Sequence, residues 1–314
     1  MLFQRLTASA ALDLVNYADV DHFRESERYL RAASMPIAAG SFLIRRAQLA
    51  LPSCTLSLVR TFPRIVNGYE LAGRVVVVIP MNDVSSARIN GEQIGNAILV
   101  LKGNAQCTVY EPEGRLVAIL STRQGRLGSR LPDFDRGYRL FGPPARELIR
   151  LQTQIAGTLE LAAREPEASQ LPAIRDSLQE TLLGTLERAL GISEIIGANR
   201  HASLDRYKGI IDRIDDLIIR NPAADLSGKQ LADEIGFSIR TIQTATQTLC
   251  GSGTYHYGRL RRLWMVRRQL RSGAAGLTVK ASAFAHGFHH MGEFSVLYRA
   301  TFGELPSHTL AAAR

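Results

Sequence analysis

The spacing of apolar residues along the chain changes twice, and each change marks a new region. From about residue 41 to residue 120, short runs of Val, Ile and Leu alternate with turn residues such as Asn67-Gly68, Asn90-Gly91 and Lys102-Gly103. Runs of this kind predict β-strands separated by turns. The predicted strands are 42–49, 55–62, 70–79, 86–89, 96–102, 106–110 and 115–120, and a helix is predicted before them at 19–33. Many short strands at this spacing favour a sandwich or a small barrel.

In the second region the apolar residues recur every three or four positions, which is the period of a helix. Helices are predicted at 145–164, 171–190 and 204–220. The clearest apolar face belongs to the first helix and consists of Leu148, Leu151, Ile155 and Leu159. Such a face fits two structures, a helical layer that covers the barrel or an interface between two copies of the chain. Pro222 disfavours helix at the residue before it and so marks the end of this region.

The last ninety residues contain one pattern twice. The first copy reads LADEIGFS at 231–238 and continues into an amphipathic run at 239–250, and the second reads ASAFAHGF at 281–288 and continues at 290–302. Each predicts a short helix, a turn that begins with Gly-Phe, and a second helix. This is the arrangement of a helix-turn-helix, whose second helix lies in the DNA major groove. Any pair of antiparallel helices can mimic one copy, but two in tandem are much stronger evidence.

The polar face of the run at 239–250 has the chemistry needed to read bases. Its apolar stripe consists of Ile242, Ala245 and Leu249. The opposite face contains no acid and presents Arg240, Gln243, Thr244 and Gln247. Side chains of these types hydrogen-bond to base edges, whereas an ordinary solvated face carries Glu and Lys.

The run at 290–302 differs because its outward side chains are small. Its apolar stripe consists of Phe294, Leu297 and Tyr298. The outward positions are Gly292, Ser295 and Arg299, with Val296 beside them. We expect this helix to read DNA less than the first, or by apolar and backbone contact.

A basic helix is predicted between the two copies, at 257–271. Its six arginines are Arg259, Arg261, Arg262, Arg267, Arg268 and Arg271. At ~1.5 Å per residue it is roughly 20 Å long. It can hold the two recognition helices in successive major grooves of one DNA face, which lie about 34 Å apart. We expect several of these arginines to neutralise phosphates and others to pack within the protein.

With these residues in view, 225–310 resembles the DNA-binding domain of the AraC/XylS family of bacterial transcription regulators. The stretch 231–243 is similar to the family's first motif, and Arg262-Leu263 followed by Val266 and Leu270 is similar to its linker helix. The second motif is matched by Gly287-Phe288, Phe294, Phe302-Gly303 and Pro306. The departures are Thr246 for a buried Phe, Thr244 for Arg or Lys, Ser282 for an apolar residue and Val296 for a frequent Arg.

The patterns and the resemblance together predict an α+β protein. Its expected parts are a cupin-like β-barrel sensor at 1–142, a helical linker and dimerisation segment at 143–224, and an all-α double helix-turn-helix domain at 225–314. The last part is expected to bind DNA by itself. The expected DNA contacts are Ser238, Arg240, Thr241, Gln243, Thr244, Gln247, Arg259, Arg262, Arg267, His290, Met291, Gly292, Ser295 and Arg299.

The distribution of charge supports the prediction of a C-terminal DNA-binding domain. The formal net charge of the chain is +9 at neutral pH, and residues 225–314 hold eleven basic and five acidic residues. A positive excess on the predicted DNA-binding domain is the expected electrostatic footprint of phosphate neutralisation.

Other classes of protein are not favoured. The chain has no GxSxG, P-loop or HExxH motif, so neither catalysis nor a cofactor is expected. A metal site of the cupin type needs several histidines, but only His22 lies in the first 200 residues. The cluster His286, His289 and His290 is more typical of surface or phosphate contacts than of a metal site.

The expected location is the cytoplasm. The chain has three cysteines and no CxxC pair, and residues 1–11 lack the pattern of a signal peptide. The longest strongly apolar run, 75–81, is too short to span a membrane.

We therefore expect a sequence-specific DNA-binding transcription regulator whose barrel binds a small-molecule effector. The expected partners are double-stranded DNA, the effector, a second copy of the chain, and RNA polymerase if the protein is an activator. Arg45, Arg46, Arg74 and Arg88 favour an anionic effector if they point into the barrel, although solvated positions on strands explain them more simply. The alternative is an architectural DNA binder that senses no ligand and uses the barrel for protein contacts. A ligand-sized cavity favours the sensor, and a filled barrel favours the alternative.

Overall fold

The computed structural model describes residues 2–17, 19–26, 31–37, 44–82, 86–123, 137–196, 201–223 and 228–314. A short 3-10 helix, η1 (Leu2–Gln4), precedes the first strand. The strands are β1 (Leu12–Tyr17), β2 (Arg31–Pro36), β3 (Ile44–Ala50), β4 (Cys54–Arg60), β5 (Arg64–Pro80), β6 (Arg88–Ile89), β7 (Glu92–Gln93), β8 (Ile98–Glu111), β9 (Leu116–Arg123), β10 (Gly137–Gly142) and β11 (Glu194–Ile196).

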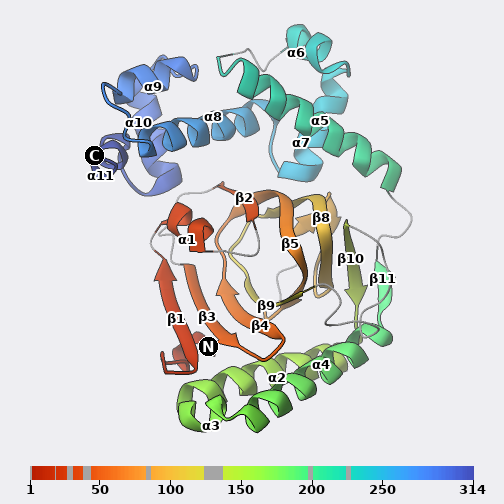
Figure 1. The fold of residues 1–314 in the computed structure, drawn as a ribbon. Coiled ribbons are helices and arrows are strands. Elements are labelled where there is room, and N and C mark those ends of the chain that lie inside the picture. Colours follow the sequence, from red (N-terminus) through yellow and green to blue (C-terminus); the bar gives the residue numbers. More distant parts are fainter. Residues whose placement is uncertain are drawn as a thin grey trace.

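The helices lie on both sides of the sheet. They are α1 (Val20–Ser26), α2 (Ala145–Arg164), α3 (Pro166–Gln170), α4 (Pro172–Gly191), α5 (His201–Arg220), α6 (Gly228–Ile235), α7 (Ile239–Cys250), α8 (Thr254–Arg271), α9 (Val279–Ala285), α10 (Met291–Phe302) and α11 (Pro306–Ala312). Figure 1 shows α2 to α4 below the sheet and α5 to α11 above it. None of the helices in the described ranges combines the length and the apolar character needed to cross a membrane.

The strands form one antiparallel, curved sheet. Its order is β1-β3-β4-β9-β5-β8-β10-β11, with β2 paired to β5 and the β6–β7 hairpin paired to β8. Within the described part of the chain no pairing joins β1 to β11, so the expected barrel is not closed. The predicted α+β fold, with a β-rich N-terminal part and a helical C-terminal part, is confirmed.

Two of the predicted turns are wrong because their glycines lie inside long strands. Gly68 in β5 and Gly103 in β8 have φ of 68° and 63°, and the register of the two strands shifts beside each of them. Positive-φ glycine serves a β-bulge as well as a turn, so sequence alone cannot separate the two. Asn90-Gly91 does form a turn, with both φ values positive, as in a type I′ hairpin. The helix predicted at 19–33 ends at Ser26, because 31–36 pairs with β5 instead.

Helices α2 and α4 cover one face of the sheet. Leu151, Ile155 and Leu159 of α2 are fully buried and pack in one cluster with sheet residues such as Leu56 and Leu120. The apolar face that fitted either a layer or a dimer interface therefore covers the sheet. The opposite face of the sheet shares a second cluster with the upper helices, from Tyr17 and Ile65 to residues of α7 and α8.

Helix α5 packs with the upper helices rather than with α2 and α4. It contacts α6, α7 and α8, and Ile210, Ile211 and Ile214 are completely buried in the cluster that they share. Two arginines of α5, Arg206 and Arg213, lie over the Phe237 ring with centroid distances of 5.0 and 5.4 Å.

The two helix-turn-helix units have the predicted glycine turns. The turns contain Gly236 and Gly287, with φ of 76° and 78°. Ser238 is the N-cap residue just before α7, and its hydroxyl accepts a hydrogen bond from the Thr241 amide at 3.2 Å, which satisfies one of the free N–H groups of the first turn. Helix α8 joins the two units (Figure 1).

Two departures from the family pattern are accommodated by hydrogen bonds. Thr246 is fully buried, and its hydroxyl contacts the Ile242 carbonyl at 3.2 Å and the Thr254 hydroxyl at 3.1 Å. The buried Ser282 hydroxyl donates to Gln269 Oε1 at 2.6 Å. A buried polar group costs little once it is hydrogen-bonded, so neither residue disrupts the packing of its helix.

Candidate nucleic-acid interface

Helix α7 presents a continuous polar face to solvent. Ile242, Ala245 and Leu249 point into the core, and the opposite positions Arg240, Gln243, Thr244 and Gln247 are exposed. The four exposed residues line an open groove of about 620 Å³ together with residues such as Thr254 and Tyr255 at the start of α8. None of the described residues that line this groove is acidic. Hydrogen-bonding groups on a helix in this setting can reach base edges.

One of these residues is already hydrogen-bonded within the helix. The Thr244 hydroxyl donates to the Arg240 carbonyl at 2.8 Å. Thr241 is half-buried and contacts the Ser238 hydroxyl at 2.9 Å, so these two residues order the start of the helix.

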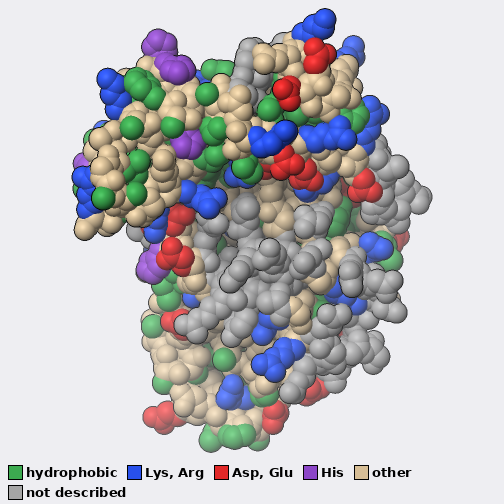
Figure 2. Space-filling view, turned by 45° about the horizontal axis from the view of Figure 1, so that its top comes forward, with side chains coloured by type: hydrophobic (Ala, Val, Ile, Leu, Met, Phe, Trp, Pro, Cys, Tyr) green, Lys and Arg blue, Asp and Glu red, His purple; other side chains and the backbone are tan. Residues whose placement is uncertain are grey.

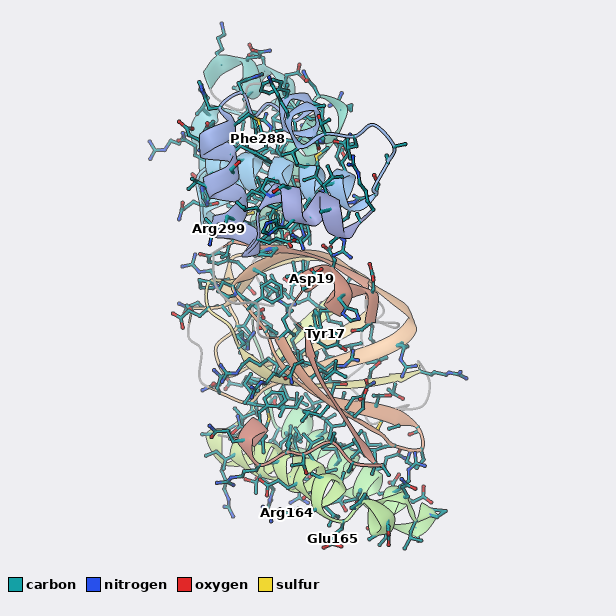
Figure 3. All side chains as sticks on the ribbon, turned by 90° about the vertical axis from the view of Figure 1, so that its left-hand side faces the viewer. Tyr17, Asp19, Arg164, Glu165, Phe288 and Arg299 are labelled. Atoms are coloured by element: carbon teal, nitrogen blue, oxygen red, sulfur yellow. The ribbon has the colours of Figure 1, made fainter. Side chains whose placement is uncertain are left out.

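Helix α10 exposes a smaller and less polar face. His290, Gly292 and Arg299 are exposed, and Met291 and Ser295 are half-buried. Val296 is 71% exposed, the largest value among the exposed large hydrophobic residues of the described ranges. Figure 3 labels Phe288 and Arg299 on this part of the molecule. This helix can approach a surface closely because Gly292 and Ala300, one turn before and after Val296, are small.

The arginines of α8 have different surroundings. Arg268 is exposed and Arg259 is half-buried beside the Tyr255 ring. Arg262 and Arg267, both expected to contact DNA, are 8% and 4% exposed. Arg261 donates to Asp215 of α5 at 3.0 Å. The structure therefore brings together the predicted residues of α7 and leaves Arg262 and Arg267 inside the protein.

Arg267 and Arg271 join α8 to the start of the sheet domain through an acidic cluster that the sequence did not reveal. The Arg267 guanidinium donates to Asp21 at 2.9 Å, to Asp19 at 3.0 Å and to Glu304 at 2.7 Å. Arg271 pairs with the same Asp19 and Asp21 and lies 3.7 Å from Glu25. We call the contact of Asp19 and Asp21 with Arg267 and Arg271 the interdomain clamp.

The charges of the clamp reinforce one another. Burial alone lowers the pKa of Arg267, but its hydrogen bonds and the nearby carboxylates raise it, so the side chain stays ionised. Burial raises the pKa of Asp19, but the amide of Asp21 and the two arginines outweigh burial, so the pKa is lowered. In Figure 3, Asp19 lies at the edge of the sheet domain that faces the upper helices.

A second contact joins the sheet to the end of α7. Gly251, which ends α7 in the left-handed region, lies against the ring of Tyr110, where a Cβ atom would come within 2.1 Å of Tyr110 Cζ. Gly91 approaches Thr248 in the same way. The hydroxyl of Tyr257 accepts from Asn67 at 3.3 Å and donates to the half-buried Asp215 at 2.8 Å. The recognition helix is thus held at its last turn by the sheet domain.

The histidines near the second turn have separate environments. His286 is buried and its Nδ1 lies 2.8 Å from the Ser282 carbonyl oxygen, whereas His289 and His290 are exposed. Among the described residues no group of His, Cys, Asp and Glu is arranged to hold a metal ion. Figure 2 shows Lys, Arg and His side chains gathered over the helical end of the molecule.

Sequence comparison assigns this helical end to a known type of domain. A family described as a helix-turn-helix domain matches residues 231–312. XylDLEGF operon transcriptional activator 2 of Pseudomonas putida is 35% identical over 101 residues, which are 32% of this chain and 64% of that protein. XylDLEGF operon transcriptional activator 1 of the same organism is 28% identical over 159 residues, 50% of this chain and 47% of that protein. The matches thus span about half to two thirds of the relatives' length.

A solved structure is also similar to part of the chain. A probable AraC family transcriptional regulator from Rhodopseudomonas palustris CGA009 is 32% identical, over 33% of this chain and 97% of that chain, with a TM-score of 0.31. The double motif and its exposed recognition face lie within residues 231–312, which the family matches. The helix-turn-helix domain of the chain is therefore of the type found in the AraC/XylS family of transcription regulators.

Proposed function

We propose that the protein is a sequence-specific DNA-binding regulator that reads bases mainly with α7. The observation that carries this proposal is the groove beside Arg240, Gln243 and Gln247, which has no acid among the described residues that line it. Arg pairs with guanine O6 and N7, and Gln with adenine N6 and N7, so this face has the donors and acceptors for direct readout. Helix α10 supplies the second contact through its small outward face. The matched relatives are named activators, which supports activation, with RNA polymerase as the partner.

The N-terminal domain controls how the two recognition helices are presented. The clamp and the Tyr110–Gly251 contact fix α8 and the last turn of α7 to the sheet. A small-molecule effector acts if it binds one arrangement of these contacts better than another. Breaking the clamp is then expected to change DNA affinity although none of its four residues touches the α7 groove.

A second function is favoured by one observation. The space between the sheet and α1 is about 40 Å³, far less than the several hundred Å³ of a usual ligand pocket. Among the described residues, a cavity too small for an effector suits an architectural DNA binder that uses its sheet domain for protein contacts. The two functions differ in whether DNA binding is selective.

The test is selection of binding sites from a randomised pool of DNA duplexes with the full-length protein. A regulator enriches one motif, and its affinity falls steeply with salt because arginines displace counterions. The variant Asp19→Asn/Asp21→Asn is expected to bind the enriched duplex with altered affinity. Asp13→Asn, which removes an exposed acid from β1, is the matched control and is expected to bind like the natural protein. Retention of DNA without any enriched motif contradicts the proposal and favours the architectural function.

A further inference from the structure

Two exposed arginines of α5 stack on one aromatic ring at the start of the first recognition helix. The guanidinium carbons of Arg206 and Arg213 lie 5.0 and 5.4 Å from the centroid of the Phe237 ring. The two residues are about two helical turns apart, so they lie on the same side of α5. Phe237 comes just before α7, which begins at Ile239. Two positive charges are thus held together at the turn that precedes α7, and we call Arg206 and Arg213 the α5 arginine pair.

No carboxylate neutralises the α5 arginine pair within the described ranges. Asp212 of the same helix pairs with Lys208, and Asp215 pairs with Arg261 at 3.0 Å. The remaining acids of α5 and α6 form no ion pair with the α5 arginine pair among the described residues: Asp205, Asp216, Asp233 and Glu234. Like charges held at one ring repel each other, so an anion placed between them is attracted by both.

The α5 arginine pair shares a surface with the start of α7. The turn residues Gly236, Ser238 and Ile239 are exposed, and Arg213 Nη1 lies 3.5 Å from the position that a Cβ atom of Gly236 would take. A recognition helix enters the major groove with its N-terminal residues toward the base edges. The turn just before that helix therefore lies at the rim of the groove, where the phosphates are.

Stacked arginines suit a phosphate at this place. A guanidinium pairs with two phosphate oxygens through parallel N–H bonds. Stacking on a ring restricts the side chain before it binds, so less conformational freedom is lost on binding. Arg213 is fixed further, because its Nη1 donates to the Ile235 carbonyl at 2.7 Å. This acceptor is neutral, so the hydrogen bond leaves the charge of Arg213 uncompensated.

We propose that Arg206 and Arg213 bind phosphates of the DNA backbone beside the bases that α7 reads. Helix α5 lies outside residues 231–312, which match the helix-turn-helix family, so the DNA interface extends beyond the double motif. The inference rests on the proposed function and adds a second class of contact to it. Phosphate contacts carry no base information, so the α5 arginine pair sets the position of α7 on the duplex and does not select bases.

The first measurement is the salt dependence of DNA binding by the full-length protein. Affinities for the enriched duplex and for a random-sequence duplex are compared between about 50 and 200 mM salt. Each lost phosphate contact lowers the slope of log affinity against log salt by about 0.9, so Arg206→Gln/Arg213→Gln is expected to lower it by about 1.8. This variant is also expected to bind about tenfold more weakly or worse, with an unchanged sequence preference.

Two controls accompany this variant. Arg206→Lys/Arg213→Lys keeps both charges and is expected to keep the salt slope. Arg146→Gln removes an exposed arginine at the start of α2, on the other side of the sheet from α5 (Figure 1), and is expected to bind as the natural protein does. Melting curves identify a variant that does not fold. In that case Arg206→Gln alone, which breaks no hydrogen bond to the backbone, is expected to lower the slope by about 0.9.

The second measurement locates the contact on the DNA. Single phosphates of the enriched duplex are replaced by neutral methylphosphonates. The natural protein is expected to lose affinity at the phosphates beside the base pairs that α7 reads, because the charge that Arg206 and Arg213 bind is gone. Arg206→Gln/Arg213→Gln is expected to be insensitive to replacement at those same positions.

The results separate this inference from the proposed function. A folded Gln variant that loses affinity without a change in salt slope has lost only a structural contact, which overturns the phosphate contact. Unchanged affinity, or equal sensitivity of both proteins to every methylphosphonate, also overturns it. A protein that prefers no sequence but whose salt slope depends on the α5 arginine pair retains the contact and loses the proposed function. A protein that enriches one motif with a slope independent of the pair retains the function and loses the contact, and absence of DNA binding overturns both.

Discussion

The DNA-binding domain is expected to need α5 in order to fold, so a fragment that begins at residue 225 is expected to be too short. Five apolar residues of α5, Ile210, Ile211, Ile214, Leu217 and Ile218, are at most 6% exposed. They belong to the cluster that also holds Leu231, Ile242 and Leu249 of the first helix-turn-helix. A fragment that begins at 225 exposes the surface of α6, α7 and α8 that these residues cover.

The magnitude follows from the burial. A fully buried large aliphatic side chain contributes about 1.5–3 kcal/mol, so five contribute about 8–15 kcal/mol. This is an upper estimate, because an unfolded chain already buries part of its apolar surface. A whole domain is stable by only about 5–15 kcal/mol. Loss of α5 therefore removes an amount comparable to the entire stability of the domain.

The assay compares fragments 201–314 and 225–314 by circular dichroism melting and by binding to the enriched DNA duplex. The longer fragment is expected to melt cooperatively and to bind in a salt-dependent manner, and the shorter fragment to do neither. In the full-length protein, Ile214→Ala is expected to cost about 2–5 kcal/mol of stability. Ile219→Ala, on the exposed side of the same helix at 55% exposure, is the matched control and is expected to cost almost nothing. Equal melting temperatures and DNA affinities of the two fragments would refute the reasoning.

Three further predictions concern single side chains. Arg240→Ala and Gln243→Ala are each expected to relax specificity at one or two base pairs by about 1–3 kcal/mol, measured by competition between the enriched duplex and point variants; undiminished discrimination in both excludes base readout by α7. Val296 is expected to contact a thymine methyl group, so replacement of one thymine by uracil weakens binding of the natural protein by about 1 kcal/mol or less and leaves Val296→Ala unaffected; equal sensitivity of both proteins at every thymine contradicts this contact. The lowered pKa of Asp19 means that its pairing stabilises the chain fully above the usual value of 3.8 and loses this effect as the pH falls through the lowered value. The melting temperatures of the natural protein and Asp19→Asn are therefore expected to differ at pH 7 and to converge as the pH falls below the lowered pKa of Asp19, and a difference that grows on acidification reverses the assignment.

The sequence alone determined the features that depend on near neighbours in the chain. Gly236 and Gly287 take the positive φ that the turns require, and Ile242, Ala245 and Leu249 are buried as the helical period predicted. The exposed face of α7 follows from the same period. The alternating β pattern likewise identified the N-terminal sheet, although not whether a glycine makes a turn or a bulge, as at Gly68 and Gly103.

Only the tertiary structure decided which segment packs against each apolar helix face and which group pairs with each charged side chain. The face of Leu151 and Ile155 fitted a layer or a dimer equally until the sheet was seen to cover it. Arg267 looked like a phosphate contact, but Asp19, 248 residues away, binds it inside the molecule. Arg64 and Arg115 meet at Glu111 because β5, β8 and β9 are neighbours in the sheet. Periodicity and turn chemistry are local, whereas the energy of a charge or an apolar face depends on segments that folding brings from far along the chain.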